Sequence, residues 1–240
     1  MADDKLTLPD EIDQRLRDWT KALKKALGDE LTCVLVHGSA ARGEYRPNDS
    51  DIDAVVVLEH ARLEHLRAIH EATQLARWSA RIETMIVVAS ELAGAADVFP
   101  LLYDEIAKES VVLVGKNPFS SIRVEDRHRR LRIEQELREA QIRLRRAVVD
   151  ALDDAALAGA VLRKTRQIRA PLAALFALRG KPCESSLSAV LARAKEVYGV
   201  ATEKLGAARE KPDEAHAALV ELLDEAIEDV DGSAAREGEP

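Results

Sequence analysis

The chain has 240 residues, of which 47% are hydrophobic and 32% are charged, with few Gly and Pro. This composition is typical of a soluble globular protein rich in helix, and the length allows one large domain or two modest ones. A net charge of −8 is unlike that of a protein that coats nucleic acid, so we expect no nucleic-acid partner.

No targeting or membrane segment is visible. No apolar run approaches the roughly 20 residues that span a bilayer, and the acidic start MADDKLTLPDE lacks the apolar core of a signal peptide. The two cysteines, Cys33 and Cys183, are far apart, which favours reduced thiols and a cytoplasmic protein without a membrane partner. Cys33 lies inside an apolar run, so we expect it in the core.

The first half of the chain alternates helical and strand patterns. Apolar residues recur at helical spacing behind Pro9 and stop at Gly28, and short apolar runs rich in β-branched residues follow. The expected elements are a helix over 10–27, strands over 31–36 and 51–58, a helix over 60–78, a strand over 81–89, short helices broken near Pro100 and a strand over 110–115. This order predicts an α/β domain with one small sheet over residues 1–116.

The second half is helical throughout. We find no strand pattern between Ile122 and Asp229, and expect an all-α domain over 117–229 followed by a flexible tail over 230–240. Pro171 should kink or restart one helix, and a serine should cap the helix that begins near residue 187. The apolar side of the first long helix is expected at Leu137, Ile142, Leu144, Val148 and Leu152.

Residues 37–57, HGSAARGEYRPNDSDIDAVVV, carry three aspartates beside a buried strand. Side chains two apart on a strand share a face, so Asp51 and Asp53 form a pair, whereas Asp49 lies in the loop, where it suits a turn. Two adjacent carboxylates repel each other unless a cation lies between them. Hard oxygen ligands of this kind suit Mg²⁺, which is usually shared with substrate phosphates.

The residues before this pair suit a phosphate. Gly38 and Ser39 follow the first strand directly, and glycine lets backbone amides approach an anion closely. A phosphate cradle followed by a carboxylate pair indicates a metal-dependent nucleotide site.

Other interpretations of these motifs fail on spacing. A calcium loop starting at Asp49 would need glycine and glutamate where Ala54 and His60 stand. Neither a P-loop motif nor GxGxxG is present. His60, His65 and His70 resemble a zinc cluster, but steps of five residues turn a helix by about 140°, so these side chains do not share a face. A purely structural explanation, in which the aspartates only cap a loop before a strand, would leave the Gly-Ser step and the second in-strand aspartate unexplained.

Gly38-Ser39, eleven residues and then Asp51-Ile52-Asp53 resemble the signature of the DNA polymerase β-like nucleotidyltransferase superfamily. The string GSAARGEYRPNDSDID is similar to its small bacterial branch, the minimal and the aminoglycoside nucleotidyltransferases. The likeness covers residues 31–115, where DEIAKESVVLVG resembles the last strand of such domains, and it is weak over the helical half. It implies an α/β (α+β) nucleotidyltransferase domain with a small mixed sheet, followed by a helical domain.

The resemblance also implies roles. Gly38 and Ser39 would hold the β- and γ-phosphates of ATP or another nucleoside triphosphate, and Asp51 and Asp53 would bind one or two Mg²⁺ ions. The third acid would be Glu83, as a metal ligand or as the base that accepts the acceptor's proton. A carboxylate in this apolar run would be costly to bury without a cation, which agrees with a role for Glu83 as a metal ligand. The alternative is a strand-edge glutamate that faces water.

Further side chains are candidates for the phosphates or the acceptor. Arg42 lies one helical turn after Ser39, and Lys164 and Arg169 would reach from the helical half.

Three acceptor hypotheses remain open. The first is a small hydroxylated molecule such as an aminoglycoside-like antibiotic, which would receive AMP while pyrophosphate leaves. The second is AMP transfer to a protein, as in antitoxin-type minimal nucleotidyltransferases, and the third is a non-catalytic binding module. The partners are then a nucleoside triphosphate with a small or a protein acceptor, and a homodimer is left open.

Overall fold

The structure is a computed structural model that describes residues 6–47 and 49–237, with side chains up to residue 232. It forms two compact units, Met1–Val124 and Glu125–Pro240. The sequence placed the domain boundary after residue 116, whereas the units separate after Val124. The intervening segment stays with the first unit because Phe119 and Val124 pack into that unit's core.

The first unit combines a small sheet with helices in the order that the sequence predicts. Three short 3₁₀ turns at Gly28–Glu30, Ala89–Glu91 and Pro118–Ser121 join its elements. The helices and strands are α1 (Asp10–Leu27), β1 (Leu31–His37), α2 (Gly38–Ala41), β2 (Ile52–Leu58), α3 (Leu63–Ala80), β3 (Ile82–Val88), α4 (Pro100–Lys108) and β4 (Val111–Gly115).

The four strands form one mixed sheet in the order β3-β2-β1-β4. β1 runs antiparallel to both β2 and β4, and β2 runs parallel to β3. The parallel pair follows from the α3 crossover, since parallel neighbours need a long connection. Together with the helical second unit, this sheet confirms the expected fold class.

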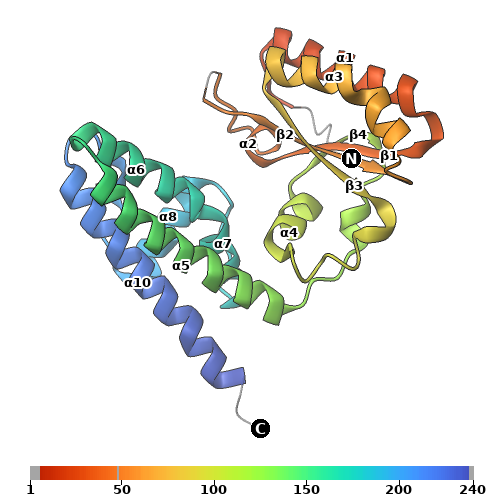
Figure 1. Cartoon of the computed structure of the whole chain (residues 1–240). Coiled ribbons are helices and arrows are strands. Elements are labelled where there is room, and N and C mark those ends of the chain that lie inside the picture. The colour runs from red at the N-terminus through yellow and green to blue at the C-terminus, as the bar shows by residue number, and fades with distance from the viewer. Residues whose placement is uncertain (1–5, 48, 238–240) are drawn as a thin grey trace. The chain divides into compact units, whose positions relative to one another are not determined.

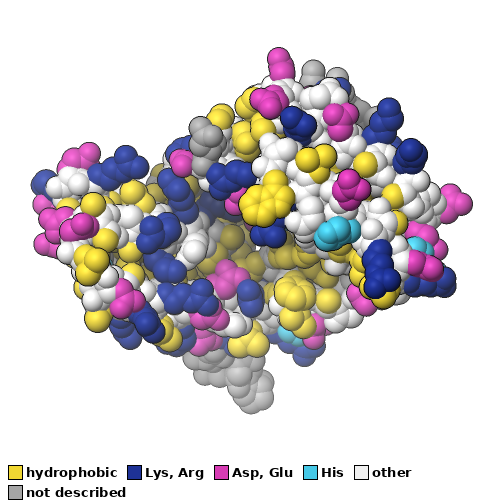
Figure 2. All heavy atoms as spheres, turned by 45° about the horizontal axis from the view of Figure 1, so that its top comes forward, with side chains coloured by type: hydrophobic (Ala, Val, Ile, Leu, Met, Phe, Trp, Pro, Cys, Tyr) yellow, Lys and Arg dark blue, Asp and Glu magenta, His cyan; other side chains and the backbone are white. Residues whose placement is uncertain are grey.

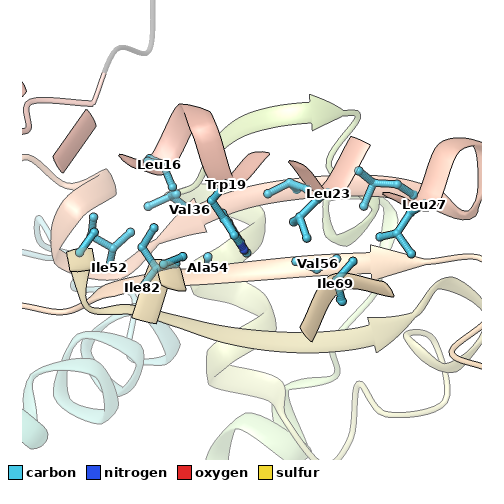
Figure 3. Packing of buried hydrophobic residues seen from close by; sticks show 14 of the residues in the cluster. Leu16, Trp19, Leu23, Leu27, Val36, Ile52, Ala54, Val56, Ile69 and Ile82 are labelled. Atoms are coloured by element: carbon cyan, nitrogen blue, oxygen red, sulfur yellow. The ribbon is translucent and has the colours of Figure 1, made fainter. Parts of the chain in front are cut away.

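Helices α1 and α3 lie side by side over one face of the sheet, and α4 lies on the other (Figure 1). On the first face, α1 turns four large apolar side chains toward the strands (Figure 3). These side chains recur every three or four residues, as an amphipathic helix requires. They are Leu16, Trp19, Leu23 and Leu27, and they meet Val36, Ala54 and Val56 from the sheet and Ile69 from α3.

The opposite face of the sheet carries the alternate strand residues. Leu35, Val55 and Val57 pack there against Tyr103 and Ile106 of α4. Cys33 belongs to this core and is fully buried, and burial raises the pKa of its thiol to about 11. The expectation of a core cysteine is therefore confirmed.

The second unit is built from helices. The two longest, α5 and α10, pack against each other, and the shorter helices pack along them. Figure 2 shows Lys and Arg side chains interspersed with Asp and Glu over the surface of these helices. The helices are α5 (Asp126–Asp150), α6 (Asp154–Gln167), α7 (Arg169–Leu178), α8 (Leu187–Tyr198), α9 (Glu203–Gly206) and α10 (Pro212–Glu237).

The buried side of α5 differs from the expected one. Leu137 and Leu144 are buried as expected. In contrast, Ile142 is 62% exposed, Val148 is 39% exposed, and Leu152 lies beyond the helix at 97% exposure. The prediction was wrong for Ile142 because five residues after Leu137 turn the helix by about 140°. The buried positions are Ile133, Leu137, Ala140 and Leu144.

The two predicted helix boundaries in this unit are observed. α6 ends at Gln167 and α7 begins at Arg169, so the break lies just before Pro171, whose ring would clash with the carbonyl four residues earlier. Ser186 caps α8, where its hydroxyl accepts a hydrogen bond from the Ala189 amide at 3.3 Å.

The end of the chain differs from the expected tail. α10 continues to Glu237, so residues 230–237 are helical, and residues 238–240 lie outside the described residues. Buried Val230 anchors this part of α10, which outweighs the helix-weakening Gly232. Over the described chain, none of the helices combines the length and the apolar character that crossing a membrane requires.

Candidate active site

The strand registers bring the predicted acids to one end of one sheet face. Asp53 pairs with Glu83 across the parallel β2–β3 ladder and with His37 across the antiparallel β1–β2 ladder. Paired residues project to the same face. Asp51 lies just before β2, close enough for its charge to act on the pKa of Asp53. The face of the paired residues is the one that α4 covers, so the acids lie where its apolar core ends.

Asp53 and Gly38 are in close contact. Gly38 has a φ of +70°, a left-handed conformation that suits glycine, and a Cβ at this position would stand 2.5 Å from Asp53 Oδ2. The Asp53 carboxylate therefore occupies the space beside the bare Cα of Gly38. Gly38 and Asp53, which are 15 residues apart in the sequence, are therefore packed directly against each other.

The pKa of Asp53 is raised above its ordinary value. Burial is the largest cause, and the nearby charges of Asp51 and Glu105 raise the pKa further. His37 and Arg42 act in the opposite direction. A carboxyl group held in this way gains from a cation, because a positive charge beside it stabilises its ionised form.

Asp51 and Glu83 already have positive partners at the end of α3. Arg81 Nε donates a hydrogen bond to Asp51 Oδ1 at 2.7 Å, and Arg77 Nε donates one to Glu83 Oε1 at 3.1 Å. The side chains of Asp51 and Glu83 are 43% and 46% exposed. Glu83 is thus half exposed on the edge strand β3, as in the alternative of a strand-edge glutamate that faces water.

Arg42 lies in a cluster of carboxylates. It contacts Glu44 at 3.0 Å and Glu105 at 2.9 Å, and Glu109 lies 3.8 Å away. Its side chain is only 12% exposed. These contacts position Arg42 between the α2 loop and α4.

Sequence reasoning missed Glu105 and His37. Glu105 on α4 acts on the pKa of Asp53, and its Oε1 lies 3.9 Å from His37 Nδ1, a buried nitrogen without a hydrogen-bond partner among the described atoms. The segment DEIAKES places Glu105 and Glu109 one helical turn apart, and this spacing was the signal that could have suggested a second acidic group.

The other candidate residues have local roles in the structure. Ser39 is partly buried, and its carbonyl accepts a hydrogen bond from the Glu44 amide at 2.8 Å, which closes the loop after α2. In the second unit, Lys164 Nζ donates to Gln167 Oε1 at 2.7 Å, and burial lowers the pKa of Lys164. Arg169 donates to the Ser185 carbonyl at 2.7 Å.

His60 and His65 gather at Glu30. His60 Nδ1 lies 3.1 Å from Glu30 Oε2, and His65 Nδ1 lies 2.7 Å from the His60 carbonyl. Within residues 6–47 and 49–232, no three His, Cys, Asp or Glu side chains are already gathered closely enough to bind a metal ion.

The chemical type of the candidate ligands nevertheless suits Mg²⁺. Asp51, Asp53 and Glu83 offer hard carboxylate oxygens from neighbouring positions at one end of the sheet. Gly38, which has no side chain, leaves room for the carboxylate of Asp53, the most buried of the three acids. For the three acids to bind one ion, Asp51 and Glu83 would have to break their ion pairs with Arg81 and Arg77.

Comparison with known proteins identifies the family of the chain. Residues 19–145 match the nucleotidyltransferase domain family. None of the curated proteins matches the sequence closely enough to count as a relative.

Among solved structures, the fold is similar to spectinomycin adenyltransferase AAD(9) from Enterococcus faecialis, a protein solved with ATP and spectinomycin. The TM-score is 0.55 at 14% sequence identity, over 89% of this chain and 98% of that one. The resemblance to the DNA polymerase β-like superfamily is confirmed. Because the family match covers more than half of the chain, this protein belongs to the nucleotidyltransferase domain family and is a nucleotidyltransferase.

Proposed function

We propose that the protein transfers AMP from ATP to a hydroxyl group of a small, aminoglycoside-like acceptor in a Mg²⁺-dependent reaction. The observation that carries this proposal is the contact between Asp53 and Gly38, with Glu83 in register beside Asp53 and Asp51 just before the same strand. The similarity in fold to an adenyltransferase solved with ATP and spectinomycin supports the choice of donor and acceptor.

In this proposal the chain's residues bind and orient the reactants. Asp51, Asp53 and Glu83 would hold Mg²⁺, which when bound lowers the charge barrier at the phosphates. Gly38 would let the backbone approach the β- and γ-phosphates, and Ser39 would donate its hydroxyl to them. Arg42 and Lys164 remain candidate phosphate ligands, although each already has the partners described above.

The reaction is an in-line displacement at the α-phosphorus. The acceptor oxygen forms a new P–O bond, the bond between the α-phosphorus and the bridging oxygen breaks, and pyrophosphate leaves with that oxygen. The acceptor's proton passes to Glu83 or to water. Glu83 suits this role because it is half exposed and therefore accessible to an acceptor.

The experiment is incubation of the full chain with Mg²⁺ and each labelled nucleoside triphosphate, against a panel of aminoglycosides and against cell lysate. We expect label from ATP on a small hydroxylated molecule. Label on a protein would instead support protein AMPylation, and no label on either would contradict both forms of transfer.

Asp51→Asn and Asp53→Asn should each lower the transfer rate by at least about 100-fold, since a metal ligand contributes several kcal/mol to the transition state. The matched control is Asp49→Asn, which removes an exposed aspartate of the same loop and should leave the rate within about twofold of wild type. Equal rates in the Asp51 variant and the control would contradict the assignment of the site.

A further inference from the structure

The end of α3 directs two arginines at two of the three site acids. Arg77 lies in the last turn of α3, and Arg81 is the residue that ends the helix. Their Nε atoms donate to Glu83 and Asp51 at 3.1 Å and 2.7 Å. Each arginine thus contacts an oxygen that a metal ion would need.

The backbone fixes Arg81 in this position. Arg81 ends α3 with a φ of +52°, a left-handed conformation that is strained for a residue with a side chain. Its carbonyl accepts a hydrogen bond from the Ile52 amide at 3.0 Å, at the start of β2. Arg81 is therefore held between α3 and β2, directly beside Asp51.

The two arginines offset repulsion between the carboxylates at this end of the sheet. Asp51, Asp53 and Glu83 place several negative charges near one another, since Glu83 is in register with Asp53 and Asp51 lies two residues before it. Without a cation these carboxylates repel one another. The two guanidinium groups supply positive charge from within the chain.

We propose that Arg77 and Arg81 are placeholder cations, which hold Glu83 and Asp51 in the metal-free protein and are displaced when a divalent cation binds. This inference rests on the proposed function, because it takes these acids to be the metal ligands. The guanidinium groups and the metal compete for Asp51 Oδ1 and Glu83 Oε1, the atoms that accept from the arginines.

Competition between the arginines and the metal ion predicts the direction in which metal affinity changes when an arginine is removed. Removing an arginine should make metal binding tighter, because the metal no longer has to break an ion pair. Both pairs are about half exposed, so solvent screens them, and we expect an increase in affinity of about twofold to fivefold for each variant.

The test is calorimetric titration of the full chain with Mn²⁺, for wild type, Arg81→Gln and Arg77→Gln. Glutamine removes the charge but keeps a long unbranched side chain, so the backbone of residue 81 is not further strained. The matched control is Arg67→Gln, which removes one charge from an exposed position of α3. We expect tighter Mn²⁺ binding for Arg81→Gln and Arg77→Gln and unchanged binding for Arg67→Gln.

A second measurement, thermal unfolding, shows whether the Arg81→Gln variant is folded and whether Mn²⁺ stabilises it. In EDTA, thermal unfolding of Arg81→Gln should occur at a lower temperature than that of wild type, and saturating Mn²⁺ should reduce the difference. Unchanged Mn²⁺ affinity in both arginine variants, or an equal increase for Arg67→Gln, would overturn the inference.

The outcome also separates this inference from the proposed function. If wild type binds Mn²⁺ and Asp53→Asn does not, the metal site stands, and the arginine variants alone decide on the placeholder role. If wild type binds no Mn²⁺, with or without a non-hydrolysable ATP analogue, the metal site itself fails and the inference falls with it.

Discussion

At the scale of single residues, burial of the Asp53 carboxyl group lowers the stability of the folded chain at neutral pH. This carboxyl group is partly buried beside other acids, and burial and these charges raise its pKa. The folded chain therefore binds this proton more tightly than the unfolded chain does. Stability from this group is greatest below the unfolded pKa of about 3.9 and falls as pH rises through the folded pKa.

Replacing Asp53 by Asn should remove this penalty. In EDTA at pH 7, we expect Asp53→Asn to be at least as stable as wild type, because the amide is of similar size and carries no charge. As pH falls to about 4, wild type should regain stability relative to the variant. Urea unfolding at several pH values measures this, and a variant markedly less stable than wild type at pH 7 would contradict the account.

At the scale of elements, helix ends are set by local hydrogen bonds that the sequence indicates. α6 begins behind Asp153, whose Oδ1 accepts a hydrogen bond from the Ala156 amide at 2.7 Å. α8 begins behind Ser186, where the corresponding bond is longer, at 3.3 Å. Such caps satisfy backbone amides that have no partner within the helix.

The Asp153 cap should contribute measurably to stability. Asp153→Ala is expected to lower the free energy of unfolding by about 1 kcal/mol, and Asp153→Asn by only a few tenths, because asparagine caps helices equally well without the charge. Urea unfolding followed by circular dichroism at 222 nm measures both. Equal losses in the two variants would show that charge, and not the hydrogen bond, is responsible.

At the scale of the whole molecule, the net charge of −8 bears on the acceptor. A negative protein attracts a polycation over long range, and salt screens this attraction, since the Debye length falls from about 10 Å at 0.1 M to about 3 Å at 1 M. An amino sugar with several ammonium groups would benefit from this attraction, whereas a neutral polyol would not.

If the acceptor is such an amino sugar, kcat/KM for it should fall by about tenfold between 0.05 and 0.5 M NaCl. An uncharged hydroxylated acceptor assayed under the same conditions serves as the control and should show a much smaller change. Steady-state kinetics at several salt concentrations measures both, and an identical salt response would exclude long-range charge as a factor in acceptor binding.

Local patterns in the sequence predict most of the helices and strands and single out the candidate site residues. Apolar spacing located α1 and the strands to within a few residues, and the pair Asp51 and Asp53 followed from the alternation of a strand. Gly38 could be singled out because a close approach of backbone to an anion needs glycine.

The residues that surround these acids follow from long-range packing. The strand order β3-β2-β1-β4 put Glu83 on a half-exposed edge strand beside Asp53, and packing of α4 brought Glu105 and Arg42 together. The end of α3 placed Arg81 against Asp51. These contacts join residues 30 to 63 positions apart, and no local pattern records which distant residues a packed core will bring into contact.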